Sequence, residues 1–436
     1  MLGFRLVPDE GMPDELAHTR KQWAFIAGAA ALTLPSALMR FGLFGHVHNA
    51  PPLETLLFGV AILGAAFLLS WGAEVAQLDI SQGLAIAFLA LIAVLPEYAV
   101  DLVFSWKAGV QDRTRLVSCG NEPCRHLAIA NMTGSNRLLI GLGWAAVVLV
   151  WFWRSKNKGV TLPGSRRTDL GFLFVATVWA MKIVILGHID LIDSAVFAVM
   201  FVLYIIHAAK EEAEEPELVG PPLAIAALSV TARRTVTIGM FVFAAAMILA
   251  SAEPFAEGLV ATGARFHINE FLLVQWLAPL ASEAPEMIIA ILFVLRAKPE
   301  KGLGTLVSSK VNQWTLLVGT VPLVYAIAHR SIAPMVMDAR QVEEILLTAA
   351  QSLFAVSVLA NMTLSRLEAS GLLVLFLAQF GFKGTTTRYG FALVYLLLFL
   401  LLVLKERANR EGLLHAIRHT FMKPGGSHQR ARSESD

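Results

Sequence analysis

Residues 281–290 read ASEAPEMIIA, and they lie inside an apolar stretch that runs roughly from Ile268 to Leu295. Glu283 and Glu286 therefore stand where the neighbouring residues predict contact with lipid. Over the whole chain, 56% of the 436 residues are hydrophobic and 16% are charged, and the mean hydropathy is +0.64. Soluble domains have fewer apolar and more charged residues. The composition therefore predicts an all-α polytopic membrane protein, and the net charge of +2 gives no reason to expect a nucleic acid partner.

About twelve segments have the roughly 17 to 25 apolar residues that cross a hydrocarbon core about 30 Å thick. They are expected near 22–43, 53–77, 80–106, 127–153, 170–188, 190–209, 236–260, 268–297, 304–328, 342–361, 365–382 and 388–404. The most polar interruption is KEEAEEPELVGPP, from Lys210 to Pro222. This stretch predicts a linker between two halves of the chain.

The loops on the side of the N-terminus carry about 22 Lys and Arg residues, against about 10 on the opposite side. Because positive side chains stay on the cytoplasmic face, both termini and the linker are expected in the cytoplasm. The first 20 residues lack the pattern of a signal peptide, so no removed leader is expected. We therefore predict an integral protein of a bacterial inner (plasma) membrane.

The only cysteines, Cys119 and Cys124, lie in the polar sequence SCGNEPCR on the side predicted to face outward. Their spacing is compatible with a small disulfide in an oxidising compartment and equally with two separate thiols. Two cysteines alone do not predict a zinc site.

The two halves of the chain resemble each other. ISQGLAIAFLALIAVLPEYAVDLVFSW begins at Ile80 and INEFLLVQWLAPLASEAPEMIIAILFVL begins at Ile268, and both reach Pro-Glu after 16 to 18 residues. A second pair follows, with IANMTGSNRLLIGLGW from Ile129 and LVSSKVNQWTLLVGTVP from Leu306. Five spans in each half place the second copy upside down relative to the first. The sequence therefore predicts two inverted five-helix repeats.

These features divide the chain into five parts. The expected parts are 1–52 (cytoplasmic N-terminus and an extra first helix), 53–209 (first repeat), 210–235 (linker), 236–382 (second, inverted repeat) and 383–436 (last helix and basic cytoplasmic tail).

Pro96 and Pro285 lie about midway along their spans, and each is followed at once by glutamate. A proline removes one backbone hydrogen bond, so both helices are expected to be interrupted there. Asp101 stands four residues after Glu97, and Glu283 three residues before Glu286, so the acids of each helix share a face. A single kink or a single acid would be structural. Several unpaired charges in the bilayer would together cost on the order of 10 kcal/mol, so these groups must meet each other, water or ions.

PEYAVD with ANMTGSN, and SEAPE with SSKVN, resemble the two alpha-repeats of the calcium/cation antiporter superfamily, the membrane region of sodium/calcium exchangers. The resemblance covers residues 53–382. It implies a ten-helix core that exchanges cations by alternating access, with 22–43 and 388–404 as additional spans. Glu97 and Glu286 match the two glutamates that bind the divalent ion in the family, and Ser135 matches a hydroxyl ligand.

The full set of candidate ligands is Glu97, Glu286, Glu283, Ser282, Asp101, Ser135, Asn136, Asn312 and Ser309, with Lys310 and Thr315 as candidate ion-coupling residues. The chain departs from the family at the hydroxyls before Leu-Pro-Glu, where it has Ala93 and Val94, and at later Asn and Asp positions, where it has Leu139 and Thr315. The usual sodium ligands are therefore incomplete.

Lys310 and Arg137 add basic groups near the expected site. One hypothesis makes Lys310 a built-in counter-cation for Glu283 or Asp101, with protons in place of sodium as the coupling ion. The alternative is that Lys310 extends to the nearby surface.

We predict a secondary active antiporter that exchanges calcium, or a related cation, for sodium or protons, with the bilayer and inorganic cations as its only evident partners and no cofactor. The alternative within transport is a sodium/proton antiporter that carries no calcium. An intramembrane hydrolase is disfavoured because the chain lacks the Gly-x-Ser-x-Gly and His-Glu-x-x-His motifs, so no enzyme is expected. A scaffold without transport would have no use for buried acids.

Overall fold

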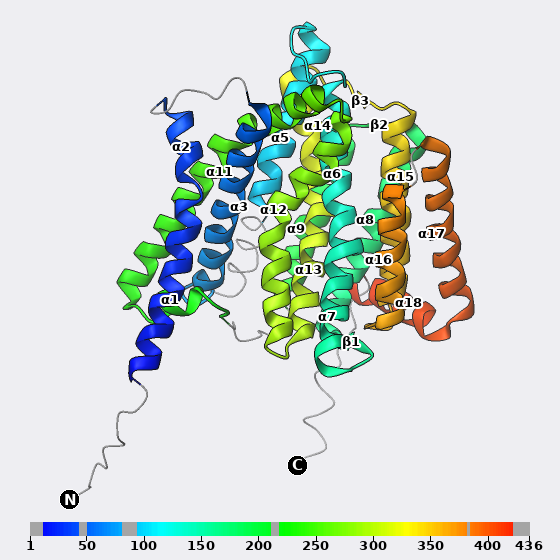
Figure 1. Cartoon of the computed structure of the whole chain (residues 1–436). Coiled ribbons are helices and arrows are strands. Elements are labelled where there is room, and N and C mark those ends of the chain that lie inside the picture. Colours follow the sequence, from blue (N-terminus) through cyan, green and yellow to red (C-terminus); the bar gives the residue numbers. More distant parts are fainter. Residues whose placement is uncertain (1–11, 43–49, 81–93, 211–217, 382–383, 422–436) are drawn as a thin grey trace, which may run out of the picture.

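The computed structural model describes residues 12–42, 50–80, 94–210, 218–381 and 384–421, with side chains from residue 19 onward. It is a bundle of helices, most of them aligned with one axis (Figure 1). The first half contains α1 (Met12–Ala31), α2 (Leu34–Arg40), α3 (Pro51–Ala76), α5 (Leu95–Thr114), α6 (Cys124–Leu138), the π-helix η1 (Leu139–Trp144), α7 (Ala145–Ser155), the 3-10 helix η2 (Gly164–Arg166), α8 (Arg167–Leu186) and α9 (Leu191–Ala208). The second half contains α10 (Pro222–Ala226), α11 (Val230–Phe266), α12 (Glu270–Leu295), α13 (Pro299–Asn312), the π-helix η3 (Gln313–Leu317), α14 (Val318–His329), α15 (Ala339–Leu359), α16 (Arg366–Gly381), α17 (Thr385–Lys405) and α18 (Arg407–Phe421).

Ten helical segments in the described part of the chain are long and apolar enough to cross a membrane. The all-α membrane fold predicted from composition is therefore confirmed. Two of the predicted spans are not among the ten. The span 80–106 is represented by α5, and its residues 81–93 lie outside the described part. The span 365–382 is represented by α16, which has only 16 described residues.

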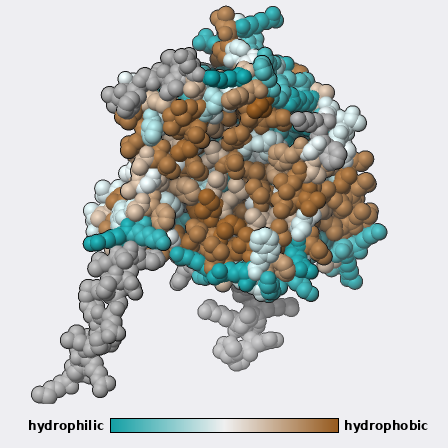
Figure 2. All heavy atoms as spheres, viewed as in Figure 1, coloured by the Kyte–Doolittle hydropathy of each residue, from teal (hydrophilic) through white to brown (hydrophobic). Residues whose placement is uncertain are grey.

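Large apolar side chains cover the outside of the bundle between its two ends. Ile185 is 80% exposed and Leu404 is 69% exposed. In Figure 2 an apolar belt crosses the middle of the molecule and hydrophilic residues gather above and below it. Because exposed apolar surface of this extent is costly in water, the belt marks the surface that faces lipid.

Four short strands show how the two halves are related. β1 (Gly159–Thr161) follows α7 and pairs with β4 (Thr363–Ser365), which follows α15; β2 (His188–Ile189) follows α8 and pairs with β3 (Met335–Val336), which follows α14. Each ladder therefore takes one strand from each half. Figure 1 shows β1 at one end of the bundle and β2 and β3 at the other, here called the β1 end and the β2 end. Since β1 and β3 occupy equivalent places in the two halves but lie at opposite ends, the repeats are inverted.

The helix expected to break at Pro285 is continuous. α12 runs from Glu270 to Leu295 through both Pro279 and Pro285, so the prediction of an interruption is wrong here. The hydroxyl of Ser282 donates to the carbonyls of Ala278 at 3.3 Å and Pro279 at 3.2 Å, while the carbonyl that Pro285 leaves without its helical partner is that of Ala281. For Pro96 the question stays open, because α5 begins at Leu95 and the preceding residues lie outside the description.

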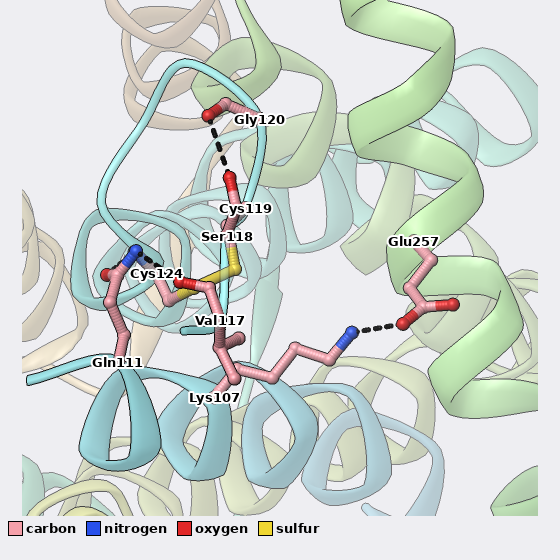
Figure 3. Close-up of a disulfide and its surroundings, with 8 residues drawn as sticks. All are labelled: Lys107, Gln111, Val117, Ser118, Cys119, Gly120, Cys124 and Glu257. Atoms are coloured by element: carbon pink, nitrogen blue, oxygen red, sulfur yellow. Dashed lines mark hydrogen bonds and ion pairs between the residues drawn. A yellow bond between two sulfur atoms is a disulfide. The ribbon is translucent and has the colours of Figure 1, made fainter. Parts of the chain in front are cut away.

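Cys119 and Cys124 form a disulfide at the β2 end, between α5 and α6. Figure 3 shows Gln111 of α5 beneath the bond, where its amide oxygen accepts from the Cys124 backbone N–H at 2.8 Å and its amide nitrogen donates to Val117 at 3.1 Å. Of the two alternatives left by the sequence, the structure has the disulfide. It uses both cysteines of the chain, so no free thiol remains.

Candidate cation-binding site

Four acids from two helices lie in the centre of the bundle. Glu97 and Asp101 come from α5 of the first half, and Glu283 and Glu286 come from α12 of the second half. Their exposed fractions are 2%, 1%, 0% and 6% in that order. Glu97 lies in the first turn of α5, where the positive end of the helix dipole stabilises a carboxylate. The two helices with Pro-Glu therefore bring acids from opposite repeats to one buried place.

The carboxyl groups of Glu97 and Glu283 lie close enough across the two halves to share a hydrogen bond when one of them is protonated. The charge of Glu286 acts on Glu97, and the charge of Glu283 acts on Glu286, so the three acids are neighbours. Two carboxylates can share a hydrogen bond only if one of them carries a proton. The arrangement therefore requires a proton, or a cation in its place, between the halves.

Several carboxylate oxygens at this place have no hydrogen-bond partner among the described residues. They are Glu97 Oε2, Asp101 Oδ2, Glu283 Oε2, and both Oε1 and Oε2 of Glu286. Ser309 of α13 lies beside Glu286 and interacts with it. Oxygen atoms of this kind are the ligands that hard cations such as calcium prefer. Within the described residues, however, no three Asp, Glu, His or Cys side chains lie close enough to form a ready-made metal shell.

Lys310 of α13 is the cation of the site. Its side chain is completely buried, which contradicts the alternative in which it extends to the surface. Its Nζ donates to Asn136 Oδ1 of α6 at 2.6 Å and lies 4.4 Å from the ring centroid of Trp314. Its charge acts on Glu283. Of the two carboxylates proposed as its partner, the structure therefore favours Glu283, while Asp101 accepts from Asn131 at 2.7 Å.

Two polar residues at the site were not recognised in the sequence. Gln313, in η3, donates from its amide to Glu283 Oε1. Tyr98, one residue after Glu97, donates from its hydroxyl to Asn312 Oδ1 at 3.2 Å. Their only sequence signal is that each adjoins a candidate ligand in a helix that carries the repeat motif. Gln313 therefore orients the same carboxylate that Lys310 faces.

Three polar side chains of α6 and η3 donate hydrogen bonds to carbonyls of their own helices. The hydroxyl of Ser135 donates to Met132 at 3.2 Å, the amide of Asn136 to Met132 at 2.8 Å, and the hydroxyl of Thr315 to Val311 at 2.6 Å. Asn136 also bonds across to the other half, because its Oδ1 accepts from Lys310, as Asn312 Oδ1 accepts from Tyr98 of the first half. Ser135 and Thr315 are completely buried, and within the described structure their side chains form no hydrogen bond with the four acids.

Both helices of the second pair contain a π-helical turn, η1 in one half and η3 in the other. Leu139 and Thr315, where the chain departs from the family pattern, lie in these turns. π-helical turns are often found at functional sites because they change the direction of side chains and the pairing of carbonyls. Their equivalent placement is a feature that residue patterns alone did not reveal.

Gly134 of α6 allows close contact with α12. A Cβ at this position would overlap the carbonyl oxygen of Gln275. That carbonyl is four residues before Pro279, whose nitrogen has no hydrogen to donate to it. The backbone of α6 therefore lies directly against the proline-rich part of α12, next to Ser135 and Asn136.

Arg137 lies close in sequence to the site but points elsewhere. Its guanidinium donates to Glu344 of α15 at 2.5 Å and to Gln379 of α16 at 3.2 Å, and it stacks over Trp276 with 5.0 Å to the ring centroid. Arg388 of α17 contacts the same glutamate. These charged groups form a second buried network, separate from the acids of α5 and α12.

Comparison with known proteins shows the family to which the chain belongs. The model of the sodium/calcium exchanger protein family matches residues 53–210 and again residues 236–384. The chain belongs to the sodium/calcium exchanger protein family. This family consists of transporters that exchange cations across membranes. The recognition made from the alpha-repeat motifs is thereby confirmed.

Several solved structures resemble the chain. The crystal structure of the H+/Ca2+ exchanger CAX is 42% identical, with 92% of this chain and 98% of that chain covered and a TM-score of 0.86. The structure of native YfkE is 15% identical, with coverages of 86% and 99% and a TM-score of 0.57. The sodium-calcium exchanger NCX_Mj is 14% identical, with coverages of 76% and 98% and a TM-score of 0.52. The last two show a shared fold. No match was found among curated protein sequences.

Proposed function

We propose that the chain is a secondary active antiporter that exchanges calcium, or a closely related divalent cation, for protons by alternating access. The observation that carries this proposal is the pair of buried carboxyl groups of Glu97 and Glu283, which come from the two inverted halves and lie close enough to act on each other. The solved relative with 42% identity is described as an H+/Ca2+ exchanger, which supports the same pair of ions.

Competition for the same oxygens would couple the two ions. A proton between Glu97 and Glu283 occupies the carboxylates that a divalent cation needs, so calcium enters as the proton leaves. Glu286, with both oxygens lacking a partner among the described residues, supplies the further ligands. Glu97 and Glu283 come from opposite halves, so an ion held by both would link the two halves.

Lys310 supports protons over sodium as the counter-ion. Its side chain places a basic nitrogen near Glu283, at a site where the family's sodium-binding hydroxyls are incomplete. When it is protonated, Lys310 neutralises part of the acidic cluster, so fewer mobile cations are needed before the site can reorient through apolar surroundings. Sodium is the alternative counter-ion and forms one arm of the test below.

The direct test is transport in vesicles. The purified protein is reconstituted, proton and sodium gradients are imposed in turn, and labelled calcium and internal pH are followed. We expect calcium movement driven by the proton gradient, lost in Glu97→Gln and in Glu286→Gln. The matched control is Glu257→Gln, which removes an acid that is paired with Lys107 near the β2 end and far more exposed (Figure 3).

Three outcomes would change the proposal. Calcium movement driven only by a sodium gradient would show that sodium, and not the proton, is the counter-ion. A sodium-driven change of internal pH without calcium movement would favour a sodium/proton antiporter. Unchanged calcium transport in both glutamine variants would remove these acids from the mechanism.

We also propose the placement in the membrane. The start of α1 and the whole of α18 lie at the β1 end (Figure 1). The distribution of Lys and Arg supports a cytoplasmic position for this end and an outer position for the disulfide, in what we propose is a bacterial inner membrane. Labelling of engineered cysteines from one side of intact cells tests this orientation, and reaction at the β1 end from outside would reverse it.

A further inference from the structure

α18 begins where the last membrane span ends. Only Glu406, with extended backbone, separates it from Lys405 at the end of α17. α17 is a candidate span in which only 11% of the most apolar window is buried, so most of its surface faces lipid. α18 therefore starts at the depth where a span leaves the hydrocarbon, at the β1 end of the bundle (Figure 1).

One face of α18 is fixed to the protein. Its buried residues recur at helical spacing, and they are Asn409, Leu413, Ala416 and Thr420. The amide of Asn409 donates to the Ser357 carbonyl near the end of α15 at 2.9 Å. A Cβ at Gly412 would overlap the Ala360 carbonyl, and a Cβ at Gly171 of α8 would overlap the hydroxyl of Thr420. These close contacts set the rotation of α18 about its axis.

A second face of α18 points away from the bundle. Arg407, Arg410, Leu414, Arg418 and Phe421 are exposed at spacings of three and four residues, so they form one stripe. Leu414 is 47% exposed and Phe421 is 46% exposed. His415 and His419 are exposed on the adjoining side, rotated away from this stripe. Arginines interleaved with large apolar residues are the pattern of a helix that lies in the membrane interface.

The arginines of this stripe differ in their partners. Arg407 bonds to Glu411 at 2.6 Å, one turn further along the helix. Arg410 and Arg418 have no acidic partner among the described residues. The end of α7, at the same end of the bundle, adds exposed positive charge at Arg154 and Lys156. This end of the protein therefore attracts anionic groups, and a guanidinium binds phosphate with two parallel hydrogen bonds.

We propose that α18 is an interfacial helix that binds the phosphate groups of anionic phospholipids. Arg410 and Arg418 contact the headgroups, while Leu414 and Phe421 enter the boundary of the acyl chains. Because α18 is fixed to the ends of α8 and α15, bound lipid acts on the scaffold that surrounds the transport site. The proposal does not depend on which ions the protein exchanges.

Fluorescence quenching tests the position of α18. Since Cys119 and Cys124 are bonded to each other, Leu414→Cys gives the chain one reactive thiol. This variant of the full chain is labelled with a fluorophore and reconstituted in phosphatidylcholine vesicles, with or without phosphatidylglycerol, that contain lipid with a nitroxide on the acyl chain. We expect quenching at position 414 and a much weaker effect for the matched variant His415→Cys, which lies on the adjoining exposed side.

Variants that remove positive charge test whether the binding partner of α18 is an anionic lipid headgroup. We expect phosphatidylglycerol to increase quenching at position 414. Substitution of Arg410→Gln together with Arg418→Gln should weaken this preference about twenty-five-fold, because each basic residue near an anionic surface contributes about fivefold. Arg113→Gln with Arg115→Gln, which removes the same charge at the end of α5 on the β2 side of the protein, is the matched control and should retain most of the preference.

Three results would overturn the proposal. Equal quenching at positions 414 and 415 would show that the stripe does not face lipid. Equal quenching with and without phosphatidylglycerol would show that α18 does not bind anionic headgroups in preference to neutral ones. A signal at position 414 that depends on the protein-to-lipid ratio would assign the stripe to contact with a second copy of the chain. Size-exclusion chromatography of every variant shows whether it is folded.

Discussion

Arg137 of α6 and Glu344 of α15 form an ion pair at 2.5 Å in which the side chains are 2% and 0% exposed. The pair joins the first repeat to the second away from the transport acids. It also includes the last span, because Arg388 of α17 contacts Glu344. In the bilayer such charges are tolerated only when they are paired, so the network fixes α6, which carries Asn136, against a scaffold helix.

Breaking this pair should destabilise the protein. We expect Arg137→Met to lower the free energy of unfolding by about 3–5 kcal/mol, because Glu344 keeps a buried charge without its main partner. Arg137→Met combined with Glu344→Gln should recover part of the loss. Thermal unfolding in detergent measures both, and a double variant less stable than the single one would contradict the interpretation.

Removing the charge of Lys310 should change the ion dependence of transport. In Lys310→Met, Glu283 loses a positive neighbour, so its carboxylate releases a proton less readily. We expect half-maximal calcium uptake to move to a higher pH and sodium to become a stronger competitor. Transport at several pH values, with and without sodium, measures this. An unchanged ion dependence would exclude Lys310 as a counter-cation.

Adding one methyl group at Gly134 should disturb the site without removing any polar atom. In Gly134→Ala the new Cβ meets the Gln275 carbonyl, so α6 must move away from α12. We expect a loss of about 1–3 kcal/mol in stability and a marked fall in calcium transport. Gly371→Ala is the matched control, because no atom lies within 4 Å of its Cβ position in α16. Similar effects of the two changes would argue against a special contact at Gly134.

A surface cluster near the β1 end should respond to acid. Asp79, just after α3, accepts from Arg233 at 2.8 and 2.9 Å and from Arg234 at 3.0 Å at the start of α11. The hydrogen bond from Arg233 is the main cause that lowers the pKa of Asp79 from 3.8 to about 2. Because the folded pKa lies below the unfolded one, this stabilisation is complete above pH 3.8 and is lost as the pH falls through about 2.

Asp79→Asn should therefore lower the melting temperature near neutral pH by no more than about 2–4 °C, as for other surface pairs. The difference between variant and parent should shrink towards pH 2. Thermal unfolding over this pH range measures it. A difference that persists at the acid end would show that the hydrogen bonds of Asp79, and not its charge, matter.

The sequence predicted the membrane fold and the principal acids because both follow from one-dimensional patterns. Apolar length indicates a span, and Pro-Glu in two matching contexts marks a repeat. The family and the central position of Glu97 and Glu286 could be inferred in this way. That these acids bind an ion stays a prediction.

The remaining features depend on how the helices are rotated and paired. Glu344 stands in RQVEEILLTAAQ, which resembles an ordinary polar helix start, and only the packing of α6, α15 and α17 shows that it neutralises Arg137. Nothing in the sequence indicated a role for Gln313, and only the structure shows that its amide donates to Glu283. The expected break at Pro285 was wrong because a proline removes only one backbone hydrogen bond, and α12 continues on both sides of it.

The strand ladders also constrain how the protein is made. Gly159 of β1 pairs with Ser365 of β4, so this ladder cannot close until the ribosome has synthesised almost the entire second half. During synthesis, the first half is therefore in the bilayer while its strands are still unpaired. A single copy of either half cannot form a ladder at either end. An ancestor made of two identical chains in antiparallel orientation would have closed both ladders with the same two strands, which is consistent with an origin by gene duplication.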